Sequence, residues 1–163
     1  MKRILSIFLT ILLLACFTAC TGNEDTVYFY YTPKAVSYGT DRDLLVAEKR
    51  GSLSREDDLS YLLSFYFQGP MDKDLSLPVP QNTQVLAVRR NGERLMLTMS
   101  PEFNQLKGMD LTLACSCIAQ TCFSLTDVES VTFTTEANPQ LNFTVTRDGL
   151  VLNDELPPKE TTN

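Results

Sequence analysis

The chain has 163 residues, of which 44% are hydrophobic and 21% are charged, as in a globular protein large enough to bury one hydrophobic core. Its formal charge is −6 at pH 7, and it contains no histidine. The negative charge argues against nucleic acid as a partner, because phosphate binding needs a basic surface, and the lack of histidine excludes serine–histidine and cysteine–histidine nucleophile pairs.

The first twenty residues have the pattern of a bacterial lipoprotein signal. Lys2 and Arg3 precede an apolar run over residues 4–14, which is too short to span a bilayer but suits a signal peptide. The segments LLAC, ending at Cys16, and FTAC, ending at Cys20, both resemble a lipobox. The resemblance implies a diacylglyceryl thioether on one of these cysteines and cleavage just before it.

We favour Cys20 as the lipidated residue, with residues 1–19 as the signal peptide; Cys16, with residues 1–15, is the alternative. The mature chain would lose Lys2 and Arg3 but no acidic residue, which leaves 12 basic against 20 acidic residues. Its covalent lipid would hold it on the outer face of the cytoplasmic membrane, and we expect no polybasic contact with lipid.

The first predicted elements after the signal are a tether and two strands. Residues 20–26 are polar and form the tether, and the β-rich segment 26–32 contains the aromatic run from Tyr28 to Tyr31. Side chains alternate across a strand, so one face of this run is expected in the core, and the other could stack on a sugar or a partner. Residues 34–43 form a loop, and residues 43–49 form a second strand.

Residues 54–67 are predicted to form the first helix. Ser54 and Asp57 have the spacing of a capping box, and the apolar side chains from Leu59 to Tyr66 recur at helical spacing. Gly69-Pro70 ends the helix. Residues 71–81 then form a loop.

The second half of the chain adds two hairpins, a helix and a strand. Asn91-Gly92 predicts a hairpin between strands 83–89 and 94–99, and residues 110–125 form the second helix. A strand at 127–135 precedes a last hairpin of 141–146 with 150–153, and the polar tail 154–163 is expected to be disordered. The order β-β-α-β-β-α-β-β over residues 27–153 predicts an α+β domain, with two helices packed on one face of a mostly antiparallel sheet.

Cys115, Cys117 and Cys122 are the first candidates for chemistry. Three thiolates could form part of a zinc site, but Cys117 would lie about 200° around the helix from Cys115. Cys115 and Cys122 are too far apart along a helix to be bridged, and their place on the apolar stripe favours packing in the core. A disulfide to another partner stays open, as does the redox state of the three, and Cys117 would be reactive if exposed. We expect no metal and no cofactor.

Two groups of acidic residues have simple structural explanations. Glu56, Asp57 and Asp58 lie at a predicted helix start, where capping and solvation are favoured over a metal or acid–base role. Asp72 and Asp74 lie in a loop that lacks the glycine and glutamate of an EF-hand. No activated nucleophile or carboxylate pair is evident, so an enzyme is not expected.

Several motifs, taken in order, resemble the GerMN domain, the sporulation and spore-germination domain of bacterial lipoproteins. A Gly-Pro follows the first helix, and the segments PQNT (80–83), LTMSPEF (97–103) and VESV (128–131) follow in turn. Asn82 stands where the family often has glycine, Thr98-Met99 replaces an acidic and aliphatic pair, and the chain has room for only one such domain. The resemblance implies a compact, non-enzymatic module that makes protein–protein contacts outside the membrane.

The expected function is therefore a lipid-anchored interaction module in a sporulation or cell-envelope assembly. It would bind envelope proteins or itself through a sheet edge or a helix face. The alternative is a lipoprotein that binds a small ligand or a peptidoglycan fragment, with the aromatic residues Tyr28, Phe29, Tyr30 and Tyr31 lining the site.

Overall fold

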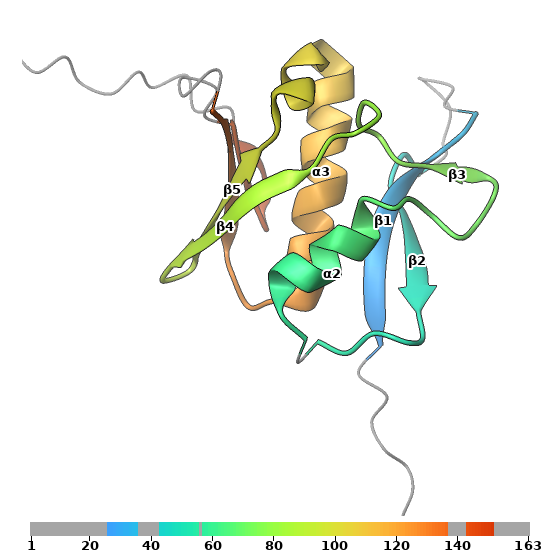
Figure 1. Ribbon diagram of the computed structural model, residues 1–163, viewed down its shortest axis with the longest axis horizontal. Coiled ribbons are helices and arrows are strands. Elements are labelled where there is room, and N and C mark those ends of the chain that lie inside the picture. Colours follow the sequence, from blue (N-terminus) through green and yellow to red (C-terminus); the bar gives the residue numbers. More distant parts are fainter. Residues whose placement is uncertain (1–25, 36–42, 56, 137–142, 152–163) are drawn as a thin grey trace, which may run out of the picture.

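A computed structural model describes residues 26–35, 43–55, 57–136 and 143–151 (Figure 1). The predicted signal peptide, Cys16, Cys20, most of the tether and the tail 154–163 lie outside these ranges. The strands are β1 (Val27–Pro33), β2 (Val46–Arg50), β3 (Leu75–Ser76), β4 (Val85–Asn91), β5 (Arg94–Met99), β6 (Ser130–Thr135), β7 (Phe143–Thr146) and β8 (Gly149–Val151). The helices are α2 (Leu59–Tyr66), α3 (Gly108–Leu125) and the short 3₁₀ helix η2 (Pro101–Gln105).

The predicted α+β class and the order of the main elements are confirmed, but the strands form two sheets and not one. The first sheet has the order β2-β1-β3, and the second has the order β4-β5-β6-β7-β8. Of the described pairings only that of β5 with β6 is parallel, as expected for strands joined through a helix. The two short strands of the last hairpin and the small β3 complete the sheets.

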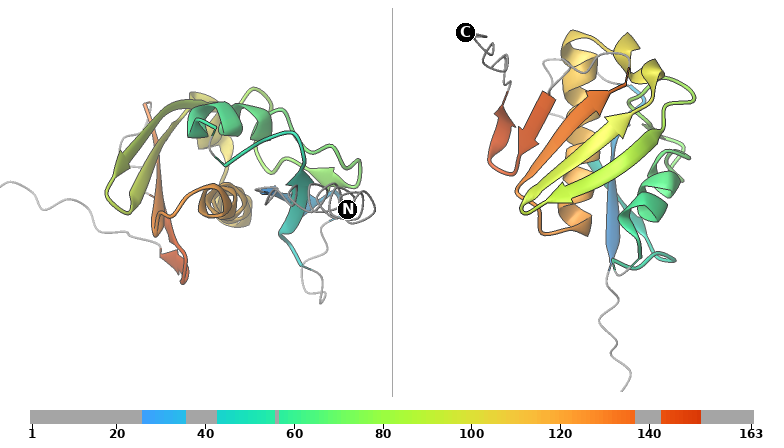
Figure 2. Two further views of the ribbon diagram at one scale, coloured as in Figure 1. Left: turned by 90° about the horizontal axis from the view of Figure 1, so that it is seen from below. Right: turned by 60° about the vertical axis from the view of Figure 1, so that its left-hand side comes forward.

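Helix α3 separates the two sheets. The edge of β1 that faces away from β2 bonds to side chains of α3: the Tyr30 amide donates to Thr121 Oγ1 at 2.9 Å, and Ser124 Oγ donates to the Tyr28 carbonyl at 2.6 Å. Viewed end-on, α3 lies between the sheets and α2 closes a further side of the core (Figure 2). These contacts occupy the edge where β1 would have joined a single sheet.

The core is therefore packed around α3 on several sides. Ten of its 18 residues are buried, more than one apolar stripe would provide. The five-stranded sheet contributes one face to this core, with the buried side chains Leu95, Leu97, Met99, Val131, Phe133, Phe143 and Val145. No helix in the described ranges is long and apolar enough to cross a membrane.

The first helix begins later than the sequence predicts. Asp58 is its N-cap and accepts hydrogen bonds from the amides of Ser60 and Tyr61. The predicted pair Ser54 and Asp57 do bond to each other, but they close a turn before the helix: the Ser54 amide donates to Asp57 Oδ2, and the Asp57 amide donates to the Ser54 carbonyl. The capping box was thus the wrong start signal, while Glu56 lies outside the described residues.

The first hairpin turns one residue later than predicted. Strand β4 continues to Asn91 and β5 begins at Arg94, so Gly92 and Glu93 form the turn. Gly92 has φ 60°, which glycine adopts without the steric cost of a side chain.

Candidate interaction site

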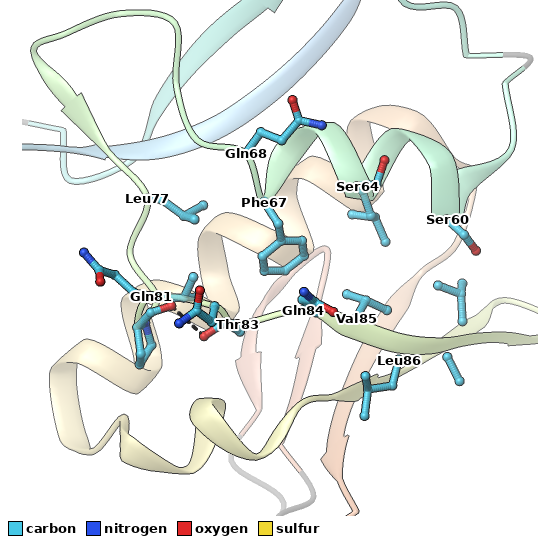
Figure 3. Close-up of a pocket in the computed structure, with 16 residues that line it drawn as sticks. Ser60, Ser64, Phe67, Gln68, Leu77, Gln81, Thr83, Gln84, Val85 and Leu86 are labelled. Carbon is cyan, nitrogen blue, oxygen red and sulfur yellow. Dashed lines mark hydrogen bonds between the residues drawn. The ribbon is translucent and has the colours of Figure 1, made fainter.

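A groove of about 710 Å³ lies between α2 and β4 (Figure 3). It is bounded by α2 and its C-terminal end, by the segment that precedes β4, and by β4 itself. None of the residues that line it is charged. They are Ser60, Leu63, Ser64, Phe67, Gln68, Leu77, Val79, Pro80, Gln81, Asn82, Thr83, Gln84, Val85, Leu86, Ala87 and Val88.

Helix α2 supplies one wall because its other face is fixed in the core. Leu62 and Tyr66 are buried, and the Tyr66 ring stacks on Tyr31 with centroids 4.9 Å apart. Ser64 and Phe67 are left facing the groove (Figure 3). Gly69, with φ +95°, ends this part of the chain in a conformation that favours glycine.

A tight turn over residues 80–83 brings the chain to the start of β4. The amide and the Oγ1 of Thr83 both donate to the Pro80 carbonyl, at 3.2 and 2.7 Å. Asn82 has φ 66°, a left-handed conformation that asparagine tolerates better than other residues with a side chain. This accounts for asparagine where the GerMN pattern often has glycine.

Gln84 and Ser100 then join β4 to the end of β5. The Ser100 amide donates to the Gln84 carbonyl at 2.9 Å, and the Gln84 amide donates to Ser100 Oγ at 3.1 Å. Gln84, which follows the motif segment 80–83 and lines the groove, is thus bonded to the motif segment 97–103.

Strand β4 is the outer strand of its sheet. It pairs with β5 alone, and its other edge faces the groove. A bulge between Val85 and Ala87 leaves Leu86 46% exposed. Helix α2 lies close beside this edge, so the groove runs along the junction of α2 and β4.

Three exposed arginines lie where β4 turns into β5, beyond the end of the groove. They are Arg89, Arg90 and Arg94. Arg90 Nη2 contacts Asp127 Oδ1 at 2.7 Å, and this hydrogen bond lowers the pKa of the Asp127 carboxyl. Both side chains are well exposed, so the pair adds little to stability.

Comparison with known proteins identifies the fold. No family model matches the sequence, and no curated protein does either. The first GerMN domain of the sporulation protein GerM from Bacillus subtilis matches the structure with a TM-score of 0.54 and 16% sequence identity, over 83% of this chain and 98% of that domain. This domain has the GerMN fold.

The tandem GerMN domains of the same Bacillus subtilis protein match with a TM-score of 0.51 and 14% identity. The match covers 77% of this chain but only 42% of the tandem structure, so the chain spans less than half of that protein's described length. At these identities the likeness concerns the fold alone. On this GerMN fold, the groove lies between the first helix and the first hairpin.

The three cysteines of α3 are free thiols in the core of the domain. Cys115, Cys117 and Cys122 are all buried, and burial raises the pKa of Cys117 and of Cys122 to about 12. Core packing is confirmed for Cys115 and Cys122. Cys117 is buried as well, because α3 is covered on several sides, so the condition for its reactivity is not met.

The aromatic strand does not form the ligand site considered from the sequence. Phe29 and Tyr31 are buried, whereas Tyr28 is 41% exposed, so the predicted alternation is confirmed. None of the residues from Tyr28 to Tyr31 lines the groove or a smaller pocket of about 240 Å³ beside Thr32. The groove is formed by α2 and β4 instead, and the sequence analysis did not predict it.

Of the acidic residues expected at the helix start, Asp58 has the predicted capping role, Asp57 closes the turn before the helix, and Glu56 lies outside the described residues. Asp58 caps α2, and Asp72 Oδ1 accepts a hydrogen bond from the Asp74 amide at 2.8 Å within the loop. In the described part of the chain, no group of three or more cysteine or acidic side chains is placed to hold a metal ion.

Proposed function

We propose that this protein is a lipid-anchored, extracytoplasmic interaction module of the GerMN type that works in a sporulation or cell-envelope assembly. The observation that carries the proposal is the groove between α2 and β4, uncharged and bordered by an unpaired sheet edge. Such a surface suits contact with a protein chain better than chemistry on a small substrate.

The role is proposed to be non-enzymatic. The thiols of α3 are buried with raised pKa values, and no charged residue lines the groove. The solved GerMN domains belong to a protein described as a sporulation protein. These observations favour binding over catalysis.

Lipid anchoring is proposed from the lipobox patterns at Cys16 and Cys20. A chain with both residues changed to alanine should leave the membrane fraction, and one of the two single variants should do the same. Membrane retention of the double variant would contradict the anchor. The alanine variants leave the folded domain unchanged, so the result is independent of the groove.

In-cell crosslinking of the lipidated full chain, followed by mass spectrometry, tests the interaction role. We expect defined envelope proteins to be recovered from growing or starved cells. They should be lost in a control that keeps residues 1–26 but lacks the domain 27–153. Recovery of this chain alone, with wall fragments, would overturn the role.

A second candidate is a lipoprotein that binds a small ligand or a peptidoglycan fragment. The volume of the groove lies within the range of small-molecule sites, and its lining includes the amide side chains of Gln68, Gln81, Asn82 and Gln84. Calorimetric titration with soluble muropeptides distinguishes the two. Heat of binding that is lost in a groove variant would favour this candidate.

A further inference from the structure

The aromatic strand β1 and its neighbour β2 have an outer face that points away from the core. Phe29 and Tyr31 are buried on the core side, and the Arg50 guanidinium lies over both rings, 5.2 and 5.9 Å from their centroids. Because side chains alternate along a strand, the next position of each strand points to the outer face. That face carries Tyr28, Tyr30, Ala47 and Lys49.

The register of β1 and β2 places these four side chains together, and we call their surface the tyrosine face. Tyr28 lies opposite Lys49, and Tyr30 lies opposite Ala47. Tyr28 is 41% exposed, Ala47 and Lys49 are exposed, and Tyr30 is half-buried. Of the described helices, α3 meets β1 at its edge and α2 meets its core side, so both leave the tyrosine face open (Figure 2).

The chemistry of the tyrosine face suits the surface of a bilayer. A tyrosine side chain has an apolar ring and a polar hydroxyl, and it is enriched where hydrocarbon meets water. A lysine can lay its apolar stem along the same surface while its ammonium stays in water. A sugar could also stack on such rings, so the position of the face in the protein has to decide between the two.

The tyrosine face begins where the tether joins the domain. Strand β1 starts at Val27, seven residues after Cys20, so a lipid on Cys20 would hold this end of β1 within about 25 Å of its point of attachment. With the alternative Cys16 the limit is about 40 Å. A surface tethered this closely meets the bilayer at a high effective concentration, which favours lipid over a more distant glycan.

The arrangement of the sheets is compatible with this contact. Helix α3 lies between the three-stranded sheet and the five-stranded sheet (Figure 2). If the tyrosine face lies on the bilayer, the five-stranded sheet lies on the far side of α3. Strand β4 belongs to that sheet, so the groove between α2 and β4 stays open to envelope proteins.

We propose that the tyrosine face rests on the outer leaflet of the membrane that holds the lipid anchor, with Tyr28 and Tyr30 in the headgroup region. This inference rests on the proposed lipid anchor and adds to it the orientation of the domain. Only one of the four side chains of the face is charged, so the contact does not require anionic lipid.

Tryptophan fluorescence tests the orientation, because the chain contains no tryptophan of its own. The lipidated full chain carrying Tyr28→Trp is reconstituted into phosphatidylcholine vesicles in which part of the lipid has brominated acyl chains that quench tryptophan. Tyr61→Trp in α2 and Met109→Trp in α3 are controls at positions 51% and 55% exposed outside the tyrosine face. Quenching should be at least about twofold stronger in Tyr28→Trp than in either control. Equal quenching of the three variants, or none in Tyr28→Trp, would overturn the proposal.

Two further readouts separate the possible failures. A chain that floats with the vesicles while Tyr28→Trp is not quenched would keep the anchor and lose this orientation, whereas a chain that does not float would contradict both. Soluble chitooligosaccharide is the probe for the glycan alternative. A fluorescence change of Tyr28→Trp with this sugar, without quenching by brominated lipid, would overturn the membrane contact and assign the face to sugar stacking.

A charge placed in the contact gives a matched test. Ala47→Asp puts a carboxylate on the tyrosine face, and Met96→Asp puts the same charge on a 37% exposed position of the five-stranded sheet. In the chain carrying Tyr28→Trp, Ala47→Asp should reduce quenching at least about twofold, because a charge resists transfer out of water, and Met96→Asp should leave it unchanged. Equal reductions would indicate only a response to net charge and would contradict the assigned face.

Discussion

At the scale of single residues, two neighbouring tyrosines differ in how their hydroxyl groups are satisfied. Tyr31 donates to the Tyr66 carbonyl at 3.1 Å and accepts from Arg50 Nη2 at 3.0 Å. Arg50 also bonds to the Gly69 carbonyl at 2.8 Å, so this cluster ties β1 and β2 to the end of α2. The Tyr66 hydroxyl is fully buried and has no hydrogen-bond partner among the described residues.

The two tyrosines should therefore respond oppositely to the same substitution. Tyr66→Phe removes a buried, unsatisfied hydroxyl and should raise the free energy of unfolding by about 1 kcal/mol. Tyr31→Phe removes the hydroxyl that accepts from Arg50 and donates to the Tyr66 carbonyl, and it should lower the free energy of unfolding by about 1.5 kcal/mol. Urea unfolding of both variants measures the difference. A loss of stability in Tyr66→Phe equal to that in Tyr31→Phe would show that its hydroxyl is satisfied.

The cysteines predict how stability depends on pH. The Cys117 thiol keeps its proton in the folded state to about pH 12, because burial raises its pKa from 9.0. Unfolded thiols ionise near pH 9, so the unfolded state binds fewer protons and stability falls as the pH rises from about 9 toward 12. The loss should be roughly 1 kcal/mol per thiol at pH 10.

Denaturant midpoints between pH 7 and pH 10 measure this loss, and Cys117→Ala should reduce the slope relative to the unchanged chain. A thiol reagent should modify Cys115, Cys117 and Cys122 only as fast as the domain unfolds. Rapid labelling of Cys117 under native conditions would contradict its burial.

At the scale of elements, Asp57 and Asp58 at the start of α2 differ in their contribution to stability, although the sequence alone does not distinguish them. Asp58→Ala removes the side chain that accepts from Ser60 and Tyr61, and it should cost about 1 kcal/mol. Asp57→Ala opens only the exposed turn to Ser54 and should cost less than about 0.5 kcal/mol. Thermal unfolding checks the order of the two, and a larger effect at Asp57 would move the start of the helix back to Ser54.

The elements that could be predicted from the sequence are those with local signals. The aromatic strand, the apolar face of α2, the Asn-Gly hairpin and the order of motifs all follow from spacing and turn chemistry. Helix boundaries were less accurate, because Ser54 and Asp57 satisfy each other in a turn as readily as at a helix end. The burial of Cys117 depends on the elements that surround α3. It could not be predicted from the apolar stripe of the helix, because Cys117 lies outside that stripe.

The groove could not be predicted from the sequence for a related reason. Its walls come from α2, from the turn at 80–83 and from the edge of β4. The local sequence of each of these segments is that of an ordinary surface element and does not indicate a groove. Only the distance between α2 and β4 makes a groove. Tyr66 holds α2 in the core by stacking on Tyr31 of β1, a strand far away in the sequence.

At the scale of the whole molecule, α3 decides that there are two sheets. The fold predicted from the sequence has both helices on one face of a single sheet. In the structure, α3 bonds to the edge of β1 and packs on the face of the five-stranded sheet. The bond from Tyr30 to Thr121 spans 91 residues, so no local pattern reveals it. Both sheets then depend on the same helix and should unfold together.

Thr121→Val tests this dependence. Thr121 Oγ1 accepts from the Tyr30 amide and donates to the Cys117 carbonyl, so valine keeps the shape but leaves a β1 amide unpaired, at a cost of about 2 kcal/mol. If the domain unfolds as one unit, hydrogen exchange should accelerate by the same factor in Phe29 of β1 and in Phe133 of β6. Thr121→Ser, which keeps the hydroxyl, should have a much smaller effect. Faster exchange confined to β1 would instead mean that the three-stranded sheet opens by itself, and that α3 and the five-stranded sheet form the stable part of the domain.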